Sequence, residues 1–524
     1  MEPFYPKYTA QILSILRSNP HNLAEEQGAR ITVDHTVSRF AFLYEKIRNV
    51  VDYKDEHLIR KAAISRILKR QLMLESNPDL IADRLVKELI GARYLANGIL
   101  DEAIINKVSL PIKKYLALSK VKAGPEKHLN WMRGLIAVEI EEILVDASEE
   151  KALITFLYER LLPVVRVRGL DLSETELHLQ VYIACYRALI KADSDMLGYK
   201  LLRAYLPEWM HPQEWLENPR PIAERLVALE RRIKLRLRHP LSQKFLRIVK
   251  PWAVSLGILR DVLKEKPEEI EELLMKPEDL AIKIARKAEE RYKRAKTKLR
   301  RGTVRAIIYL FLTKMLVALL VEVPLEWLWY EDINRLALAV NLLFPPALMF
   351  LVGLLIKVPG QANTQKLKDG VKKLLDEEPI VVGEIRAPKQ RTGTKRFWFT
   401  ITYAATFLLS FGLIYSILRA IDFTGISIVI FIFFLCIVSF FGFRLRMTAR
   451  EVVVVEGRQR TWSVLADFLS LPILRAGQWL SRGISRFNVF VFIFDFLFEA
   501  PFKIFLTVLE EWFSFMREKK DELQ

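Results

Sequence analysis

The sequence predicts an all-α membrane protein, with a soluble helical half followed by a membrane-bound half. Apolar residues up to about Lys298 recur at helical spacing, with almost no alternation of the kind strands show. A strongly basic stretch, Lys283 to Arg305, then runs into about 17 residues nearly free of charge, the length with which a helix begins to cross a hydrocarbon core. We therefore expect a soluble cytoplasmic multi-helix domain over 1–282, a basic juxtamembrane helix over 283–303, a transmembrane unit over 304–443 and amphipathic membrane-surface helices over 444–524.

The net charge of +18 allows two kinds of partner. A basic stripe is typical of nucleic-acid binding, but here the densest basic run lies directly beside a span. Anionic lipid headgroups are therefore the simpler partner, and nucleic acid is the less favoured one. The basic residues that we expect to contact lipid are Arg291, Lys293, Arg294, Lys296, Lys298, Arg300 and Arg301.

Cysteine content and the first residues indicate a reducing compartment for the soluble half. The two cysteines are Cys185, in the soluble half, and Cys436, inside an expected span, so we expect no structural disulfide. The initial residues resemble neither a secretory signal nor a transit peptide. We therefore expect the first 300 residues to stay in the cytoplasm.

Local signals mark several helix starts in the soluble half. Asn77 and Asn218 each precede a proline, which is the pattern of a capping residue followed by proline at the first helical position. Ser173, with Glu176 three residues later, forms a capping box. These signals predict helices that begin at about residues 78, 174 and 219.

The soluble half shows no catalytic or metal-binding pattern. It has no HExxH, CxxC, P-loop or GxSxG motif. Glu174 and His178 fit a surface i,i+4 pair better than a metal pair. Glu139, Glu141 and Glu142 alternate with apolar residues and predict a solvated helix face. We expect no catalytic residue, cofactor or metal, and a protein that is not an enzyme.

The second half predicts four spans, at about 304–321, 336–356, 397–418 and 423–443, with a cytoplasmic loop over 357–396. The connection after the first span is acidic and carries Trp327, Trp329 and Tyr330, which suits an outer membrane interface. The loop over 357–396 and the segment after the fourth span are rich in Lys and Arg. The positive-inside rule then predicts a multi-pass protein of the plasma (inner) membrane with both termini in the cytoplasm.

Two further expectations concern the remaining segments. The β-branched runs 379–385 and 451–456 suit strands, and we expect that they could pair into a two-stranded cytoplasmic ribbon. Over 488–519 the polar residues fall on one side of a helical wheel, and 462–481 is a shorter version of this pattern. Both predict helices that lie in the membrane interface. The alternative is that their apolar faces pack on the spans or on another subunit, which leaves a homo-oligomer open.

Lys314 is the one basic residue near the middle of an expected span. A lysine at the bilayer centre costs about 2.5–3.5 kcal/mol, so it needs a partner. Pro345 and Pro346 in the second span cannot donate to the carbonyls of Asn341 and Leu342. We expect the Lys314 ammonium to bond these carbonyls or the Asn341 side chain, because no acidic residue was expected at that depth. The bond would be a structural clamp or, alternatively, part of an anion or proton site.

Three functions remain open at this point. A large domain without motifs, joined to the membrane by a basic helix, favours a non-enzymatic membrane-anchored scaffold or regulator with a cytoplasmic protein partner. Lys314 and the paired prolines favour a small channel or transporter with a site between the first two spans. An enzyme acting at the membrane has only the amphipathic helices in its support.

Overall fold

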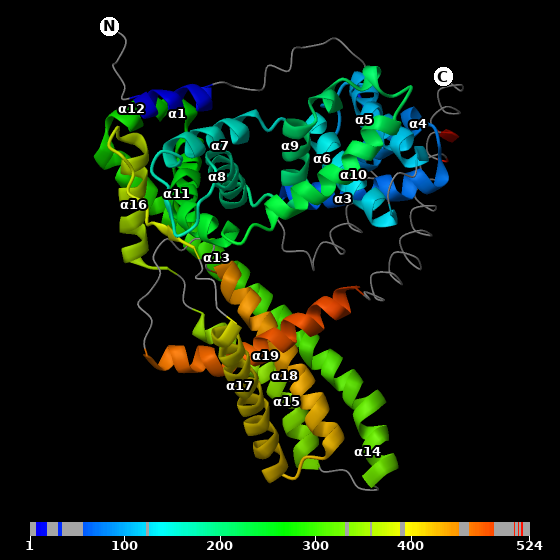
Figure 1. Ribbon diagram of the computed structural model, residues 1–524, viewed down its shortest axis with the longest axis vertical. Helices are drawn as coiled ribbons and strands as arrows, with labels where there is room; N and C mark the ends of the chain where they lie inside the picture. The colour runs from blue at the N-terminus through cyan, green and yellow to red at the C-terminus, as the bar shows by residue number, and fades with distance from the viewer. Residues whose placement is uncertain are drawn as a thin grey trace. The chain divides into compact units, whose positions relative to one another are not determined.

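The computed structural model describes residues 7–17, 30–33, 56–121, 125–330, 335–356, 359–387, 393–449 and 461–486, together with 508, 512, 515 and 516. Its described residues form two compact units. Unit 1 takes them from Met1–Ala253, Lys373–Ala387 and Ile493–Gln524, and unit 2 takes them from Val254–Lys372 and Pro388–Phe492. Almost all of this structure is helical, as predicted (Figure 1).

Unit 1 is a set of helices around an apolar core that draws on most of them. Its regular elements are α1 (Lys7–Arg17), α3 (Glu56–Leu74), α4 (Pro78–Gly91), α5 (Ala103–Val121), α6 (Glu126–Leu144), α7 (Ser148–Leu161), β1 (Val167–Arg168), α8 (Glu174–Leu189), α9 (Ser194–Tyr205), η1 (Pro207–Met210), η2 (Pro212–Glu214), α10 (Arg220–Leu237), β2 (Ile385–Arg386) and the first part of α11 (Ser242–Leu263).

Two of the predicted helix caps are present. The Asn77 side chain accepts a hydrogen bond from the Asp79 amide at 3.0 Å, and the Ser173 hydroxyl accepts one from the Glu176 amide at 3.3 Å. Each cap satisfies a backbone donor that the first helical turn cannot pair itself. At the third start the helix begins one residue later than expected, with Pro219 rather than Asn218 at the cap position.

The prediction of a solvated face for the glutamates of α6 is wrong. Glu139 and Glu141 are both about 6% exposed. Lys114 donates to Glu139 at 2.6 Å, and the indole of Trp209 donates to its other oxygen at 2.9 Å. Arg60 donates to Glu141 at 3.0 Å. A buried carboxylate needs such donors because it has lost its water, and they come from helices that the local pattern of α6 does not show.

Of the strand expected over 379–385, only its last residue, Ile385, is in a strand, and that strand has a different partner from the expected one. Ile385 and Arg386 pair in parallel with Val167 and Arg168, whereas the expected partner, 451–456, lies outside the described residues. Arg160 of α7 holds the same segment, because its guanidinium donates to the carbonyls of Lys373, Asp376 and Glu378 at 2.6–3.3 Å. Part of the loop expected over 357–396 is thus built into unit 1.

Unit 2 contains the helices that could cross a membrane. The elements are the end of α11, η3 (Pro267–Glu269), α12 (Ile270–Met275), α13 (Pro277–Val317), the π-helical turn η4 (Ala318–Glu322), α14 (Val323–Tyr330), α15 (Arg335–Leu355), α16 (Gln361–Leu375), α17 (Gly393–Ala420), α18 (Gly425–Ala449) and α19 (Thr461–Arg486). Four helices are long and apolar enough to cross a membrane, which confirms the predicted number of spans. They cover Pro277–Trp329, Ala337–Leu355, Gly393–Ala420 and Gly425–Met447.

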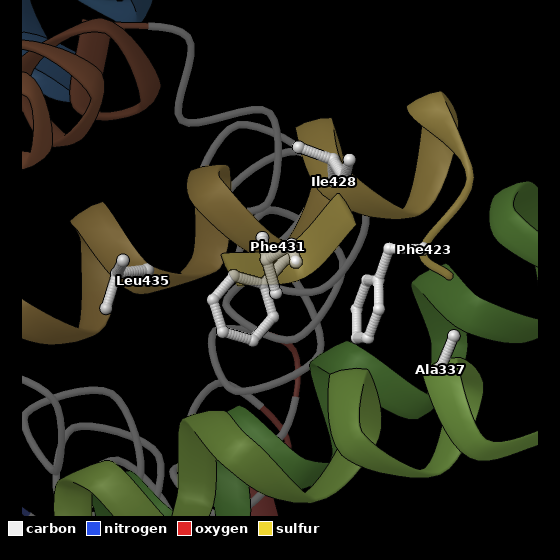
Figure 2. Close-up of a cluster of buried hydrophobic side chains, with 6 residues drawn as sticks. Ala337, Phe423, Ile428, Phe431 and Leu435 are labelled. Carbon is white, nitrogen blue, oxygen red and sulfur yellow. The ribbon is translucent and has the colours of Figure 1, made fainter. Parts of the chain in front are cut away.

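An aromatic cluster joins α15 to the start of α18. Figure 2 shows Phe423 and Phe431 between these two helices, with Ala337 on α15 and with Ile428 and Leu435 of the same cluster on α18. The rings of Phe423 and Phe431 meet edge to face, with centroids 6.0 Å apart, and Phe344 lies 4.7 Å from Phe431. This arrangement is the favoured one for aromatic pairs, and it places dry, apolar surroundings beside the polar residues described below.

The helix α19 packs against the spans α17 and α18. The Ser410 hydroxyl of α17 donates to the carbonyl of Leu469 at 3.1 Å. Gly477 lies directly on the backbone of α18, where a Cβ atom would overlap the carbonyl of Cys436. For residues 461–486 the structure therefore shows the packed alternative, although it contains no membrane. The helix expected over 488–519 lies largely outside the described residues.

Replacing Glu139 with Leu should destabilise unit 1 strongly. The substitution leaves the Lys114 ammonium buried without its partner, and breaking a buried pair typically costs about 3–5 kcal/mol. Glu384→Gln is the control, because its ion pair with Arg168 is exposed and such pairs contribute about 0–1 kcal/mol. Urea unfolding followed by circular dichroism measures both, and equal losses would contradict the buried role of Glu139.

Replacing Gly477 with Val should separate α19 from α18, because no side chain fits against the Cys436 carbonyl. We expect a lower melting temperature in detergent and faster proteolysis between α18 and α19. Gly412→Val is the matched control, since a Cβ at Gly412 of α17 would meet nothing within 4 Å. Equal behaviour of the two variants would show that the α18–α19 contact does not stabilise unit 2.

Candidate functional site

The basic stretch of α13 divides into one fixed residue and several exposed ones. Arg291 donates to Asp261 at 2.5 Å and to the carbonyl of Gly257 at 2.8 Å, so the fold of unit 2 holds it. Lys293 pairs with Glu289 on the surface at 3.1 Å. The remaining members of the predicted lipid-contacting set are exposed along the helix; they are Arg294, Lys296, Lys298, Arg300 and Arg301. Contact with lipid stays a prediction for these residues.

The first span continues past its expected end at Val321. The helical backbone runs through η4 and α14 to Tyr330, so Glu322 and Glu326 lie within a helix rather than in an external connection. Residues eight apart in a regular α-helix differ by about 80° in direction. The extra residue of a π turn removes about 100° of rotation. The turn Ala318–Glu322 therefore brings Glu322 back to the face that carries Lys314.

Lys314 and Glu322 form a completely buried ion pair. Both side chains are 0% exposed, and the Lys314 ammonium donates to Glu322 Oε2 at 2.9 Å. The ammonium also lies 5.0 Å from the centre of the Phe434 ring of α18. The expected bond from Lys314 to the Asn341 carbonyl, the Leu342 carbonyl or the Asn341 side chain is thus wrong: its partner is an acid. Sequence reasoning missed this partner because it placed Glu322 at the membrane boundary.

Asn341 does belong to the site, through Glu322. Its side-chain amide donates to Glu322 Oε1 and lies 3.4 Å from the carbonyl of Ser427. Pro345 and Pro346 lie inside α15, which remains helical from Arg335 to Leu355. Two residues of the predicted intramembrane set, Lys314 and Asn341, therefore come together because both bond Glu322. The other two, Pro345 and Pro346, are part of the helix that carries Asn341.

A second carboxylate, Glu326, lies beside the first and is 1% exposed. Its Oε1 atom is 2.6 Å from the hydroxyl of Thr424 and 2.7 Å from the hydroxyl of Ser427. The Ser427 hydroxyl is also 2.7 Å from Glu322 Oε1. One serine of α18 therefore connects the two carboxylates. We call the group Lys314, Glu322, Glu326, Asn341, Thr424 and Ser427 the carboxylate cluster.

The start of α18 contributes electrostatically to the cluster. Thr424 directly precedes the helix, and its hydroxyl accepts from the Ser427 amide at 3.2 Å. A helix N-terminus carries about half a positive charge and favours nearby anions. Glu326, bonded to Thr424 and Ser427, thus has a partial counter-charge, while Glu322 has the full charge of Lys314.

The cluster nevertheless lacks positive charge and donors. Two carboxylates face one ammonium, and burial in an apolar bundle makes an uncompensated charge costly. Two of its oxygens, Glu326 Oε2 and Asn341 Oδ1, have no hydrogen-bond partner among the described residues. Both are acceptors. The species that would complete the cluster is therefore one that brings a positive charge or a hydrogen, namely a cation or a proton.

Unit 1 has one hollow that could be considered as an alternative site. It has a volume of about 550 Å³ and is lined by Lys151, Lys200 and Arg203, with Tyr182 and Tyr186 beside them. All three cations already contact Glu142. Burial raises the pKa of Glu142, but Lys200 and Lys151 outweigh it and hold that pKa below its usual value. The hollow thus contains its own counter-charge, unlike the carboxylate cluster.

Within the described part of the chain, no group of three or more His, Cys, Asp or Glu residues could hold a metal ion. Comparison of the chain with protein-family models, with curated proteins and with solved structures finds no match. The carboxylate cluster of unit 2 is accordingly the candidate site, and the argument for a function starts from its chemistry.

Proposed function

We propose that this chain is a channel or transporter that moves a monovalent cation, H⁺ or Na⁺, through its four-span unit. The observation that supports the proposal is the unbalanced carboxylate cluster: two buried acids with one lysine, and acceptor oxygens without donors. Ionisable residues inside a membrane are costly and usually line ion or proton pathways. The π turn that positions Glu322 is also a feature found frequently at functional sites.

A purely structural clamp accounts for only part of the cluster. A clamp requires Lys314, Glu322 and Asn341, which bond to one another through Glu322. It does not require Glu326, whose burial adds a second acid and an oxygen without a donor. A structural role alone would favour a neutral residue at this position, because a well-packed neutral side chain is at least as stable as a buried charge.

The proposed membrane and the proposed orientation of the chain are inferred from the sequence. We propose the plasma (inner) membrane, with both termini and the basic residues of α13 on the cytoplasmic side, where they would face anionic headgroups. The carboxylate cluster would then lie near the outer ends of the spans. The sequence alone favours a membrane-anchored scaffold or regulator with a cytoplasmic protein partner; this function is the alternative to the transporter, and unit 1 would then be the part that binds the partner.

Purified protein in liposomes should dissipate an imposed H⁺ or Na⁺ gradient, and Glu326→Gln should abolish this activity. Glutamine has nearly the same shape as glutamate but can neither gain nor lose a cation at this position. A pH-sensitive dye and a Na⁺-sensitive dye inside the vesicles measure the two fluxes separately.

The matched control for this experiment is Glu289→Gln, which makes the same chemical change at an exposed position of α13. It should transport like the wild-type protein. Absence of both fluxes in wild-type liposomes, with the protein folded and inserted, would contradict the proposed function and leave the scaffold as the better hypothesis.

Single cysteines should report the orientation of the spans. We expect labels at Tyr330 and Asp422 to react with an impermeant reagent from outside intact cells, and labels at Lys368 and Arg458 to react only after permeabilisation. The native Cys185 and Cys436 are buried and should remain unlabelled. Reaction of the Lys368 label from outside would contradict the proposed orientation.

A further inference from the structure

The cluster contains three short oxygen–oxygen contacts and too few hydroxyl hydrogens to fill them. The contacts are Thr424 to Glu326 at 2.6 Å, Ser427 to Glu326 at 2.7 Å and Ser427 to Glu322 at 2.7 Å. These are the distances of O–H···O hydrogen bonds, each of which contains one hydrogen. Thr424 and Ser427 supply one hydroxyl hydrogen each. A hydrogen from a carboxyl group would give the third contact a bond of its own, so that the two carboxylates need not share the Ser427 hydrogen.

Glu322 is less suited than Glu326 to carry this proton. It already accepts from Lys314 at Oε2 and from Asn341 at Oε1, and both bonds favour its ionised form. Glu326 forms no ion pair with Lys314, whose ammonium bonds Glu322 instead, and the Glu326 Oε2 atom has no donor among the described residues. A proton on Glu326 Oε1 completes the pattern: it is donated to Ser427 Oγ, and the Ser427 hydroxyl is then free to donate to Glu322.

We propose that the transported ion is a proton, that Glu326 holds it, and that Ser427 passes it to Glu322. This inference rests on the proposed function. In the transfer, the O–H bond of Glu326 breaks as a bond to Ser427 Oγ forms, while the Ser427 hydroxyl hydrogen moves to Glu322 Oε1. Glu326 becomes a carboxylate and Glu322 a neutral acid, so one proton moves between the carboxylates and no atom is gained or lost.

The charged groups around this relay are few in the described structure. Lys314 of α13 faces Glu322 and holds its negative charge. The nearest elements otherwise contribute Asn341 of α15 and the hydroxyls of α18, which are neutral. Arg419 of α17 is exposed and donates to the carbonyl of Phe423 at 3.4 Å rather than to either acid. Asp422 and Arg335 are exposed as well. The two acids therefore differ in that Glu322 is paired with Lys314 and Glu326 is not.

The relay is tested by infrared difference spectroscopy on the full-length protein in liposomes. The wild-type protein should show the C=O band of a protonated, buried carboxylic acid, shifted in D₂O. Glu326→Gln should lack this band yet fold normally, because glutamine donates and accepts as a protonated glutamate does. Glu289→Gln should retain the band.

Two further pairs of variants test the assignment and the path. Glu322→Gln should be much less stable than Glu326→Gln, since it removes the counter-charge of Lys314. Ser427→Ala should keep a carboxylic acid band, shifted by the lost hydrogen bond, but lose H⁺ flux. The matched control is Thr402→Ala, which removes an exposed hydroxyl of α17 that donates to the carbonyl of Trp398 at 2.9 Å; it should transport like the wild type.

The outcomes separate this inference from the proposed function. Na⁺ flux without H⁺ flux would overturn the proton assignment and leave the cation transporter standing. The acid band without any flux would support the bound proton and contradict transport. A wild-type protein without the band, a band that survives in Glu326→Gln, or failure of Glu326→Gln to fold would each overturn the assignment to Glu326.

Discussion

The buried Lys314–Glu322 pair is the interaction on which the first part of the membrane unit depends. Neither charge could remain in an apolar bundle alone, because removing an ion from water without a partner costs several kcal/mol. The pair in turn requires the π turn, since a regular α-helix would aim Glu322 away from Lys314. It also fixes Asn341, and with it the position of α15 relative to α13. One electrostatic requirement thus connects helix geometry, helix packing and the candidate site.

The same requirement is met differently in unit 1. Glu139 is buried as well, but Lys114 and Trp209 occupy both of its oxygens. Glu142 is surrounded by three cations. These groups are complete, and their bonds contribute to the fold of unit 1. Glu326 is the contrasting case. Its second oxygen has no donor among the described residues, and Lys314 is paired with the neighbouring Glu322. A buried acid whose oxygens all have donors is a structural group. A buried acid that lacks a donor, as Glu326 does, marks a candidate site.

Prediction from the sequence succeeded where the signal was local or depended on composition. The number of spans followed from the length of apolar runs, and the caps at Asn77 and Ser173 followed from short-range patterns. Lys314 and Asn341 were also recognised as residues that need partners inside the membrane. Prediction failed for Glu322, Glu139 and Glu141. Glu139 and Glu141 looked solvated because they alternate with apolar residues, and Glu322 because it falls at the expected end of the span. The partners of the first two lie on distant segments, and that of Glu322 is reached only after a change in helical twist.

The sequence by itself determined the helical class, the four spans and the basic segment before the first of them, because apolar length and charge density act along the chain. The tertiary structure decided which charges meet. The carboxylate cluster joins residues that lie up to 113 positions apart in the sequence, from Lys314 to Ser427. The spacing of apolar and polar residues along the chain does not indicate such contacts. It arises because apolar helices pack together and leave their few polar side chains no partners except one another.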